Sequence, residues 1–291
     1  VRVVDASGNV ITGHPVTTVT ASKASGPSAG SLGGTTANTS SGVATFSGMN
    51  ITGAGGTYTI TFSATGLASV TSSSLTINKT AQSITFNALT TKTFGNAAFG
   101  ITATANSGLV VAFSTTTPAV CSVAGDTTTT GASATAAVVT LLGAGTCTIA
   151  TNQAGNDTYD AATQVTRSFT VNQATQATLT LANSNAVSFG NTLTLATSGG
   201  SGTGAVTYAL TAGAGTANCT LNTTTGAMTF GSVGTCTVRA EKALDTNYNV
   251  IQSATQTITV SRAAQSTSIT STAPSSPLAS GTYVVTATAT S

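Results

Sequence analysis

Residues 56–60, 145–149 and 234–238 read Gly-Thr-Tyr-Thr-Ile, Gly-Thr-Cys-Thr-Ile and Gly-Thr-Cys-Thr-Val. The third position of each copy lies 89 residues after that of the copy before it (147 − 58 and 236 − 147). Solenoid and propeller repeats have periods of about 20 to 50 residues, whereas a complete β-sandwich domain has about 100. The period therefore predicts a tandem array of similar domains, which is suited to spanning distance and resisting pulling.

The composition predicts a folded chain whose polar surface is uncharged. Charged residues make up 5% of the chain, against about 25% in an ordinary globular domain. A disordered chain has few large apolar residues and a high net charge, but this chain is 40% hydrophobic with a net charge of +2. Threonine, serine, asparagine and glycine replace the missing charges, so we expect folded domains.

The same composition excludes two classes of partner. The eight lysines and arginines are scattered and form no basic patch of the kind that binds nucleic acid. No apolar run approaches the roughly 18 residues of a membrane-spanning helix, and the first residues do not read as a signal peptide. We therefore predict no nucleic-acid partner and no membrane segment in this chain, and we expect export to be encoded upstream.

Strand patterns occur from end to end, and no segment has helical periodicity. Four segments alternate apolar and polar residues or run in β-branched ones, namely residues 57–62, 138–142, 177–181 and 255–260. Glycine-rich clusters at residues 30–34 and 198–204 indicate turns between strands. Short strands joined by such turns predict an all-β fold of sandwiches.

Domain boundaries follow from a second repeated phrase. Residues 74–77, 168–171 and 257–260 each look like a last strand, and each is followed within five residues by a glutamine that opens the next one (Gln82, Gln176 and Gln265). Linkers this short leave neighbouring domains little freedom, which predicts immunoglobulin-like sandwiches arranged end to end as a rod. The predicted domains are residues 1–78, 79–172 and 173–261, with a partial domain at 262–291.

The two ends of the array differ from its middle. The first domain opens directly at a predicted strand, residues 1–4, without an earlier one, and residues 262–291 carry only the first strands of a domain. Two explanations stay open. The chain is a segment of a longer protein, or its tail supplies strands to the first domain of another copy in a strand-exchanging filament.

The third position of the pentapeptide predicts a tyrosine corner in the first domain and a disulfide in each of the next two. In immunoglobulin-type sandwiches a tyrosine near the start of strand F bonds the backbone at the E–F corner, and Tyr58 fits this corner. The next two domains have cysteine there, and each has one further cysteine. Four cysteines allow three connectivities, but only Cys121–Cys147 and Cys219–Cys236 stay within single domains. Two disulfides imply an oxidising, extracellular location.

The sequence predicts no catalytic residue, metal or cofactor, and so no enzyme. His14 lies in a turn-like Thr-Gly-His-Pro segment and is expected to be an exposed loop residue, and no Cys-x-x-Cys spacing indicates zinc. Residues 156–160 (Asn-Asp-Thr-Tyr-Asp) and 245–249 (Asp-Thr-Asn-Tyr-Asn) occur at the same phase of the repeat. We interpret them as turns in which asparagine or aspartate bonds the backbone, with weak calcium binding as the alternative.

Two groups of motifs resemble known repeats. Residues 42–48 (GVATFSG) and 55–62 (GGTYTITF) resemble the invasin/intimin-type bacterial immunoglobulin-like repeat. Residues 117–123 (TPAVCSV), 141–149 (LLGAGTCTI) and 153–161 (QAGNDTYDA) are similar to the cysteine-containing immunoglobulin-like repeats of giant bacterial surface proteins. The resemblance implies stalks and fibres of adhesins. It transfers no functional residue, because the shared positions are those of corners, turns and disulfides.

These observations predict an extracellular structural segment of a bacterial surface adhesin, fibre or sheath, acting as a stalk or filament building block without catalysis. Its expected partners are neighbouring domains of the same chain and other copies of itself. Two alternatives remain: a strand-exchanging filament subunit, and a cell-adhesion module that binds glycan or ice. The second alternative draws on Thr-x-Thr pairs such as Thr102 and Thr104.

Overall fold

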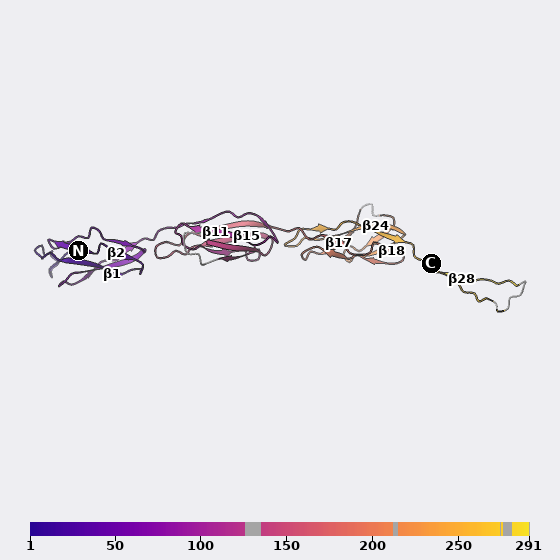
Figure 1. Cartoon of the computed structure of the whole chain (residues 1–291), viewed down its shortest axis with the longest axis horizontal. Coiled ribbons are helices and arrows are strands. Elements are labelled where there is room, and N and C mark those ends of the chain that lie inside the picture. Colours follow the sequence, from indigo (N-terminus) through magenta and orange to yellow (C-terminus); the bar gives the residue numbers. More distant parts are fainter. Residues whose placement is uncertain (126–134, 212–214, 274, 276–280, 291) are drawn as a thin grey trace. The chain divides into compact units, whose positions relative to one another are not determined.

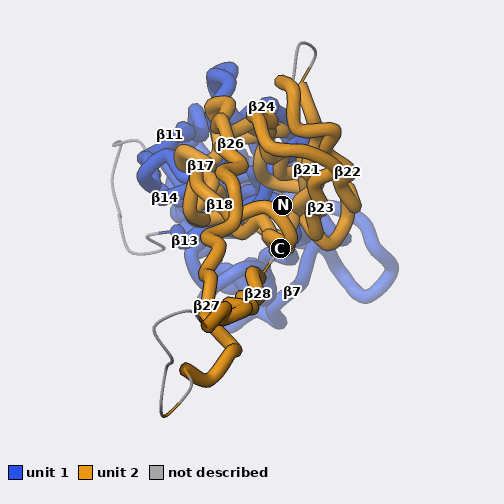
Figure 2. The backbone as a smooth tube through the Cα atoms, turned by 90° about the vertical axis from the view of Figure 1, so that its right-hand side faces the viewer, with its two compact units in different colours: residues 1–171 blue, residues 172–291 orange. Residues whose placement is uncertain are grey.

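The computed structural model describes residues 1–125, 135–211, 215–273, 275 and 281–290. All of its regular elements in these ranges are β-strands (Figure 1), so the all-β prediction is confirmed. The chain divides into two compact units, Val1–Val171 and Asn172–Ser291, which Figure 2 shows in different colours. The first unit holds two immunoglobulin-like sandwiches, and the second holds a third sandwich and a C-terminal hairpin. The rod and the exact domain boundaries stay predictions.

The first sandwich contains strands β1 to β8. Their bounds are β1 Thr18–Ser25, β2 Ser31–Gly33, β3 Thr36–Ser40, β4 Val43–Ala44, β5 Asn50–Thr52, β6 Gly56–Ser63, β7 Val70–Thr71 and β8 Leu75–Ile77. One sheet has the order β4-β3-β1-β6-β7, with β8 also pairing with β6, and the other is β2-β5. Residues 1–4, predicted as a strand, form only isolated bridges, of which Arg2 with Val43 is one.

The second sandwich contains strands β9 to β16 in two four-stranded sheets, β10-β16-β15-β12 and β13-β14-β11-β9. Their bounds are β9 Ile84–Phe86, β10 Lys92–Thr93, β11 Phe99–Ala105, β12 Ala112–Thr115, β13 Cys121–Gly125, β14 Thr135–Leu141, β15 Gly145–Asn152 and β16 Val165–Asn172. Strand β11 alternates buried and exposed residues along its length. This period of two sends Ile101 and Ala103 inward, where they join Val139 and Ile149 in one core.

The third sandwich contains strands β17 to β26. Their bounds are β17 Leu179–Leu181, β18 Ala186–Ser188, β19 Leu193–Thr194, β20 Thr197–Gly199, β21 Val206–Leu210, β22 Cys219–Leu221, β23 Ala227–Phe230, β24 Gly234–Lys242, β25 Ile251–Gln252 and β26 Gln256–Ser261. The main sheet has the order β18-β26-β24-β21, with β25 on β24, and it faces β19-β23-β22; β17 pairs with β20. Met228, Val238 and Ile258 are fully buried between the sheets.

The C-terminal hairpin pairs β27 (Thr267–Ile269) with β28 (Ala287–Ala289) in antiparallel register. Each residue of both strands is exposed. The apolar side chains of Ile269 and Val284 are 71% and 77% exposed, so the described part of this hairpin has no core of its own.

Candidate functional site

Each copy of the pentapeptide opens the long central strand of its sandwich, β6, β15 or β24. The first glycine of the three copies (Gly56, Gly145, Gly234) has a φ of 145°, 135° and 145°, a conformation that residues with a Cβ rarely adopt. The third side chain is buried in all three sandwiches, whereas the flanking threonines lie at or near the surface. The pentapeptide therefore sets one inward anchor per domain.

In the first sandwich the anchor is Tyr58, which is only 1% exposed. Its hydroxyl donates a hydrogen bond of 2.7 Å to the carbonyl oxygen of Ala54, two residues before β6 begins. Gly26 and Gly30 lie so close to the ring that a Cβ at either position would collide with it. The tyrosine thus fills a slot that two glycines keep open, and its hydroxyl fixes the corner before β6.

In the second and third sandwiches the anchors are Cys147 and Cys236. Each is paired with the cysteine of the same domain on the opposite sheet, Cys121 on β13 and Cys219 on β22. The Cα atoms of the two pairs are 5.8 Å and 6.4 Å apart, within the usual disulfide range of about 4.4 to 6.8 Å. The pairs are those proposed from the sequence. Each joins the two sheets of its sandwich at the position that Tyr58 occupies in the first sandwich.

The two Asx-containing segments are hydrogen-bonded turns. Asn156 Oδ1 accepts from the backbone N–H groups of Thr158 and Tyr159, at 2.8 and 2.9 Å. Asp245 Oδ1 accepts from Asn247 and Tyr248 at the same two distances. Because backbone donors already occupy these side-chain oxygens, the geometry favours the structural-turn interpretation over calcium binding.

The two turns differ in charge, and this predicts a pH dependence in one of them. The pKa of Asp245 is lowered from its usual value near 3.8, mainly by the N–H of Thr203, which lies 2.6 Å from Oδ2, and then by that of Asn247. A lowered pKa means that the carboxylate stabilises the fold above the unfolded-state pKa and loses this effect as the pH falls through the folded value. We expect the amides of Asn247 and Tyr248 to lose hydrogen-exchange protection below about pH 3.8.

Two comparisons test this pH prediction. The uncharged Asn156 turn serves as the internal control, so the amides of Thr158 and Tyr159 should keep their protection across the same range. Asp245→Asn should remove the acid transition and retain the turn. Equal loss of protection in both turns would show that acid destabilises both sandwiches rather than acting through Asp245.

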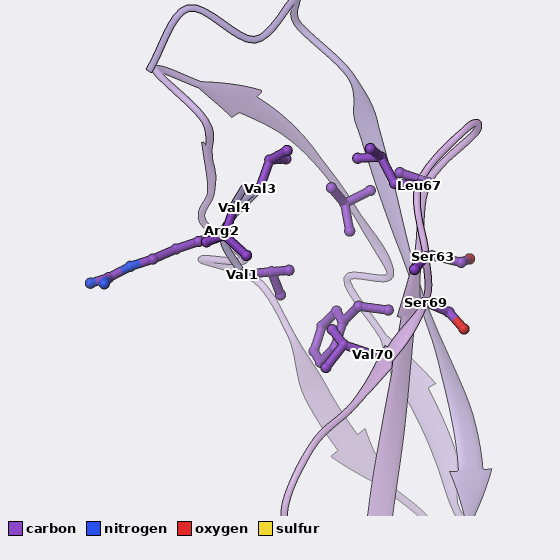
Figure 3. Close-up of a pocket in the computed structure, with 12 residues that line it drawn as sticks. Val1, Arg2, Val3, Val4, Ser63, Leu67, Ser69 and Val70 are labelled. Carbon is purple, nitrogen blue, oxygen red and sulfur yellow. The ribbon is translucent and has the colours of Figure 1, made fainter. Parts of the chain in front are cut away.

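A hollow of about 340 Å³ opens in the first sandwich between residues 1–4 and the β6–β7 hairpin (Figure 3). Its lining includes Val1, Val3, Val4 and Leu67, while the guanidinium of Arg2 points away from it (Figure 3). An apolar hollow without an acid, base or nucleophile directed into it offers packing surface rather than chemistry.

The described residues assemble no reactive cluster. None of their histidine, cysteine, aspartate and glutamate side chains gather in groups of three or more that could hold a metal ion. His14 is half-buried rather than fully exposed as predicted, because its Nδ1 lies 2.8 Å from the carbonyl oxygen of Pro15 and 3.5 Å from Thr17 Oγ1. Among the described residues, none forms a helix long and apolar enough to cross a membrane.

Two sets of contacts in the structure were not predicted from the sequence. Gly26 and Gly30 are needed beside Tyr58, yet they lie 32 and 28 positions before it in the chain (58 − 26 and 58 − 30). The sequence predicts Gln82 and Gln176 as the residues that open strands, but their side-chain amides bond the loops that contain the Asx turns. Their recurrence at the same distance after each last strand was the available signal.

Comparisons with known proteins return similar structures and no relative in sequence. No family model and no curated protein sequence matches the chain. The protocadherin gammaB7 EC3-6 structure aligns at a TM-score of 0.33 and 14% identity, over 84% of this chain and 68% of that one. Domains 4–9 of the surface layer protein SbsC align at 0.26 and 16%, over 93% and 43%. The D00-D0 domain of intimin aligns at a TM-score of 0.25 and 12% identity, over 61% of this chain and 98% of that one.

Proposed function

We propose that this chain is an extracellular structural segment of a bacterial surface adhesin, fibre or sheath, in which it serves as a stalk or filament building block without catalysis. One observation carries the proposal. Three successive sandwiches place the same pentapeptide on the same central strand, with its third side chain as a buried anchor. A load-bearing array requires a structural anchor that is repeated in each domain. The described residues repeat such an anchor and form no reactive cluster.

The anchors support a mechanical role outside the cell. A disulfide joins the two sheets in the second and third sandwiches, and disulfides persist in oxidising compartments. Exposed hydroxyl pairs such as Thr148 with Ser168 (2.8 Å) and Thr61 with Thr71 (3.0 Å) replace surface ion pairs. Neutral contacts of this kind are not screened by salt, so the array keeps its surface contacts when the ionic strength outside the cell changes.

Pulling the chain from its ends tests the mechanical proposal. The Cys121–Cys147 disulfide closes a loop with a sequence separation of 26. At about 3.5 Å per extended residue, it should shorten the chain released by the second sandwich by roughly 90 Å, and reduction should restore that length. The first sandwich, which has no cysteine, should release the same length under both conditions. If all domains unfolded at forces no greater than those that extend a flexible linker, a load-bearing role would be contradicted.

The cellular part of the proposal has a separate test. Antibodies against the folded chain, applied to native cells for immunogold electron microscopy, should label the outer surface or extracellular filaments. Labelling confined to the cell interior would contradict the proposal, whatever the result of the pulling experiment.

Two alternative functions each have one supporting feature. Thr146 lies opposite Thr170 and Thr148 opposite Ser168 on one sheet face, which favours a glycan- or ice-binding surface and predicts activity in glycan-array or ice-recrystallisation assays. The exposed apolar side chains of the C-terminal hairpin and the apolar hollow of the first sandwich favour strand exchange between copies. Light scattering that shows only monomers would rule out strand exchange.

A further inference from the structure

The linker before the second sandwich is bound by the loop between β15 and β16. The N–H of Thr80 donates to the carbonyl oxygen of Thr158 (2.8 Å), and the N–H of Asp160 donates to that of Thr80 (2.9 Å). This places Thr80 beside Tyr159 in a parallel bridge. The Gln82 side-chain amide adds a bond of 2.5 Å to the carbonyl oxygen of Asp160.

The third sandwich binds its own linker with the same set of bonds. Ala174 N–H donates to Asn247 (2.8 Å), and Asn249 N–H donates to Ala174 (2.9 Å). Gln176, two residues after Ala174 as Gln82 is after Thr80, donates 2.7 Å to the Asn249 carbonyl. We call this arrangement of linker and Asx-turn loop the linker clamp. Its repetition in two separate units shows that it belongs to the domain type.

In the first unit the clamp loop also reaches the sandwich before it. The carbonyl oxygen of Asp157 accepts from the N–H of Gly55 at 2.7 Å. The hydroxyl of Thr158 donates to the carbonyl oxygen of Gly53 at 2.5 Å. A Cβ at Gly55 would collide with the backbone of Lys79, so the glycine lets the linker pass close to this surface. The loop tip thus contacts both the linker and the end of the preceding domain.

We propose that the Asx-turn loop of the second sandwich docks on the end of the first sandwich and the linker after it, that this contact fixes the joint without a metal ion, and that the end of a domain of this type is a docking surface for such a loop. Every contact described above joins neutral amides, hydroxyls and carbonyls. The joint therefore requires no cation.

The same positions recur after the third sandwich. Ala263 and Gln265 have the spacing of Thr80 and Gln82, and Val233 precedes Gly234 as Gly55 precedes Gly56. A hollow of about 440 Å³ lies here, lined in part by Phe189, Val233, Ala263 and Gln265. These residues present the linker half of the clamp at an exposed surface, which agrees with a docking surface for the Asx-turn loop of another domain of this type.

Spin labels on either side of the first joint test the proposal in the complete chain. Val16 in the first sandwich and Val138 in the second are 76% and 48% exposed, so cysteines introduced there can be labelled and the distance distribution measured by double electron–electron resonance. We expect a narrow distribution that neither calcium nor EDTA changes. Asn156→Ala, which removes the turn, should at least double its width and raise the exchange rate of the Thr80 amide tenfold or more.

Two further variants separate docking from a general loss of fold. Thr158→Val keeps the turn and removes only the hydroxyl bond to Gly53, so it should broaden the distribution while the Thr80 amide stays protected. Asn222→Ala removes an Asx turn of the same kind that contacts no linker. In this turn the N–H groups of Thr224 and Thr225 each donate to Asn222 Oδ1 at 3.0 Å. This substitution should leave the distance distribution unchanged. A broad distribution in the unmodified chain, narrowing on addition of calcium, or no effect of Asn156→Ala would overturn the proposal.

Discussion

Removal of the Cys121–Cys147 disulfide is expected to lower the free energy of unfolding of the second sandwich by about 3.5 kcal/mol. The chain-entropy model gives this value for a sequence separation of 26. The shorter loop of Cys219–Cys236, with a separation of 17, gives about 3 kcal/mol for the third sandwich. Either loss is large against the roughly 5 to 15 kcal/mol that stabilises a typical domain.

The measurement is chemical denaturation of Cys121→Ala/Cys147→Ala, followed by hydrogen exchange resolved to each sandwich. The double substitution leaves no free thiol, so its effect reports the cross-link together with some loss of packing at two fully buried positions. The first sandwich has no cysteine and should keep its stability, which makes it the control within the same molecule. A non-reducing intact mass that shows four free thiols in carefully prepared material would contradict the disulfides themselves.

Tyr58→Ala is expected to destabilise the first sandwich by about 3 to 5 kcal/mol, as large aromatic-to-alanine changes in cores do. The ring is 1% exposed. Gly26 and Gly30 lie against it and have no side chains, so they cannot fill the cavity that the substitution would leave. Tyr58→Phe separates the two parts of this effect. It keeps the ring but leaves the buried Ala54 carbonyl without its hydroxyl donor, which should cost about 1 to 3 kcal/mol.

Tyr283→Phe is the matched control for the hydroxyl. Its hydroxyl also donates a bond of 2.7 Å, to Ser271 Oγ, but the residue is 42% exposed and water can replace the partner. We expect a change below about 0.5 kcal/mol for this surface substitution. If Tyr58→Ala cost less than about 1 kcal/mol in thermal unfolding resolved to the first sandwich, Tyr58 would not be its anchor.

Much of the fold could be predicted because its signals are local in the sequence. The segment 57–62, with its alternation of threonine and apolar residues, lies within β6, and residues 255–260 overlap β26. Alternation reports which face of a strand is buried, so it needs no knowledge of the partner strand. Residues 1–4 were the exception: they make bridges to Val43 and Val10 but no continuous ladder, and the extent of pairing depends on the partner.

The functional features divide in the same way. The Asx turns were predictable, since each side chain bonds a backbone two or three residues away. The linker clamp was not, because Gln82 meets Asp160 across 78 residues of chain. Only the folded sandwich brings these residues together, and no local pattern marks a glutamine that will donate to a particular carbonyl.

The sequence by itself determined the repeating unit, its all-β class and the inward position that Tyr58, Cys147 and Cys236 share. These follow from spacing and alternation, which are properties of the chain before it folds. The tertiary structure decided which surfaces meet: the glycines that make room for Tyr58, and the loop that holds each linker. The glycine slot depends on which ring lies against it, and the clamp depends largely on backbone N–H and C=O groups that nearly every residue possesses. Both become specific only when the fold brings distant segments into contact.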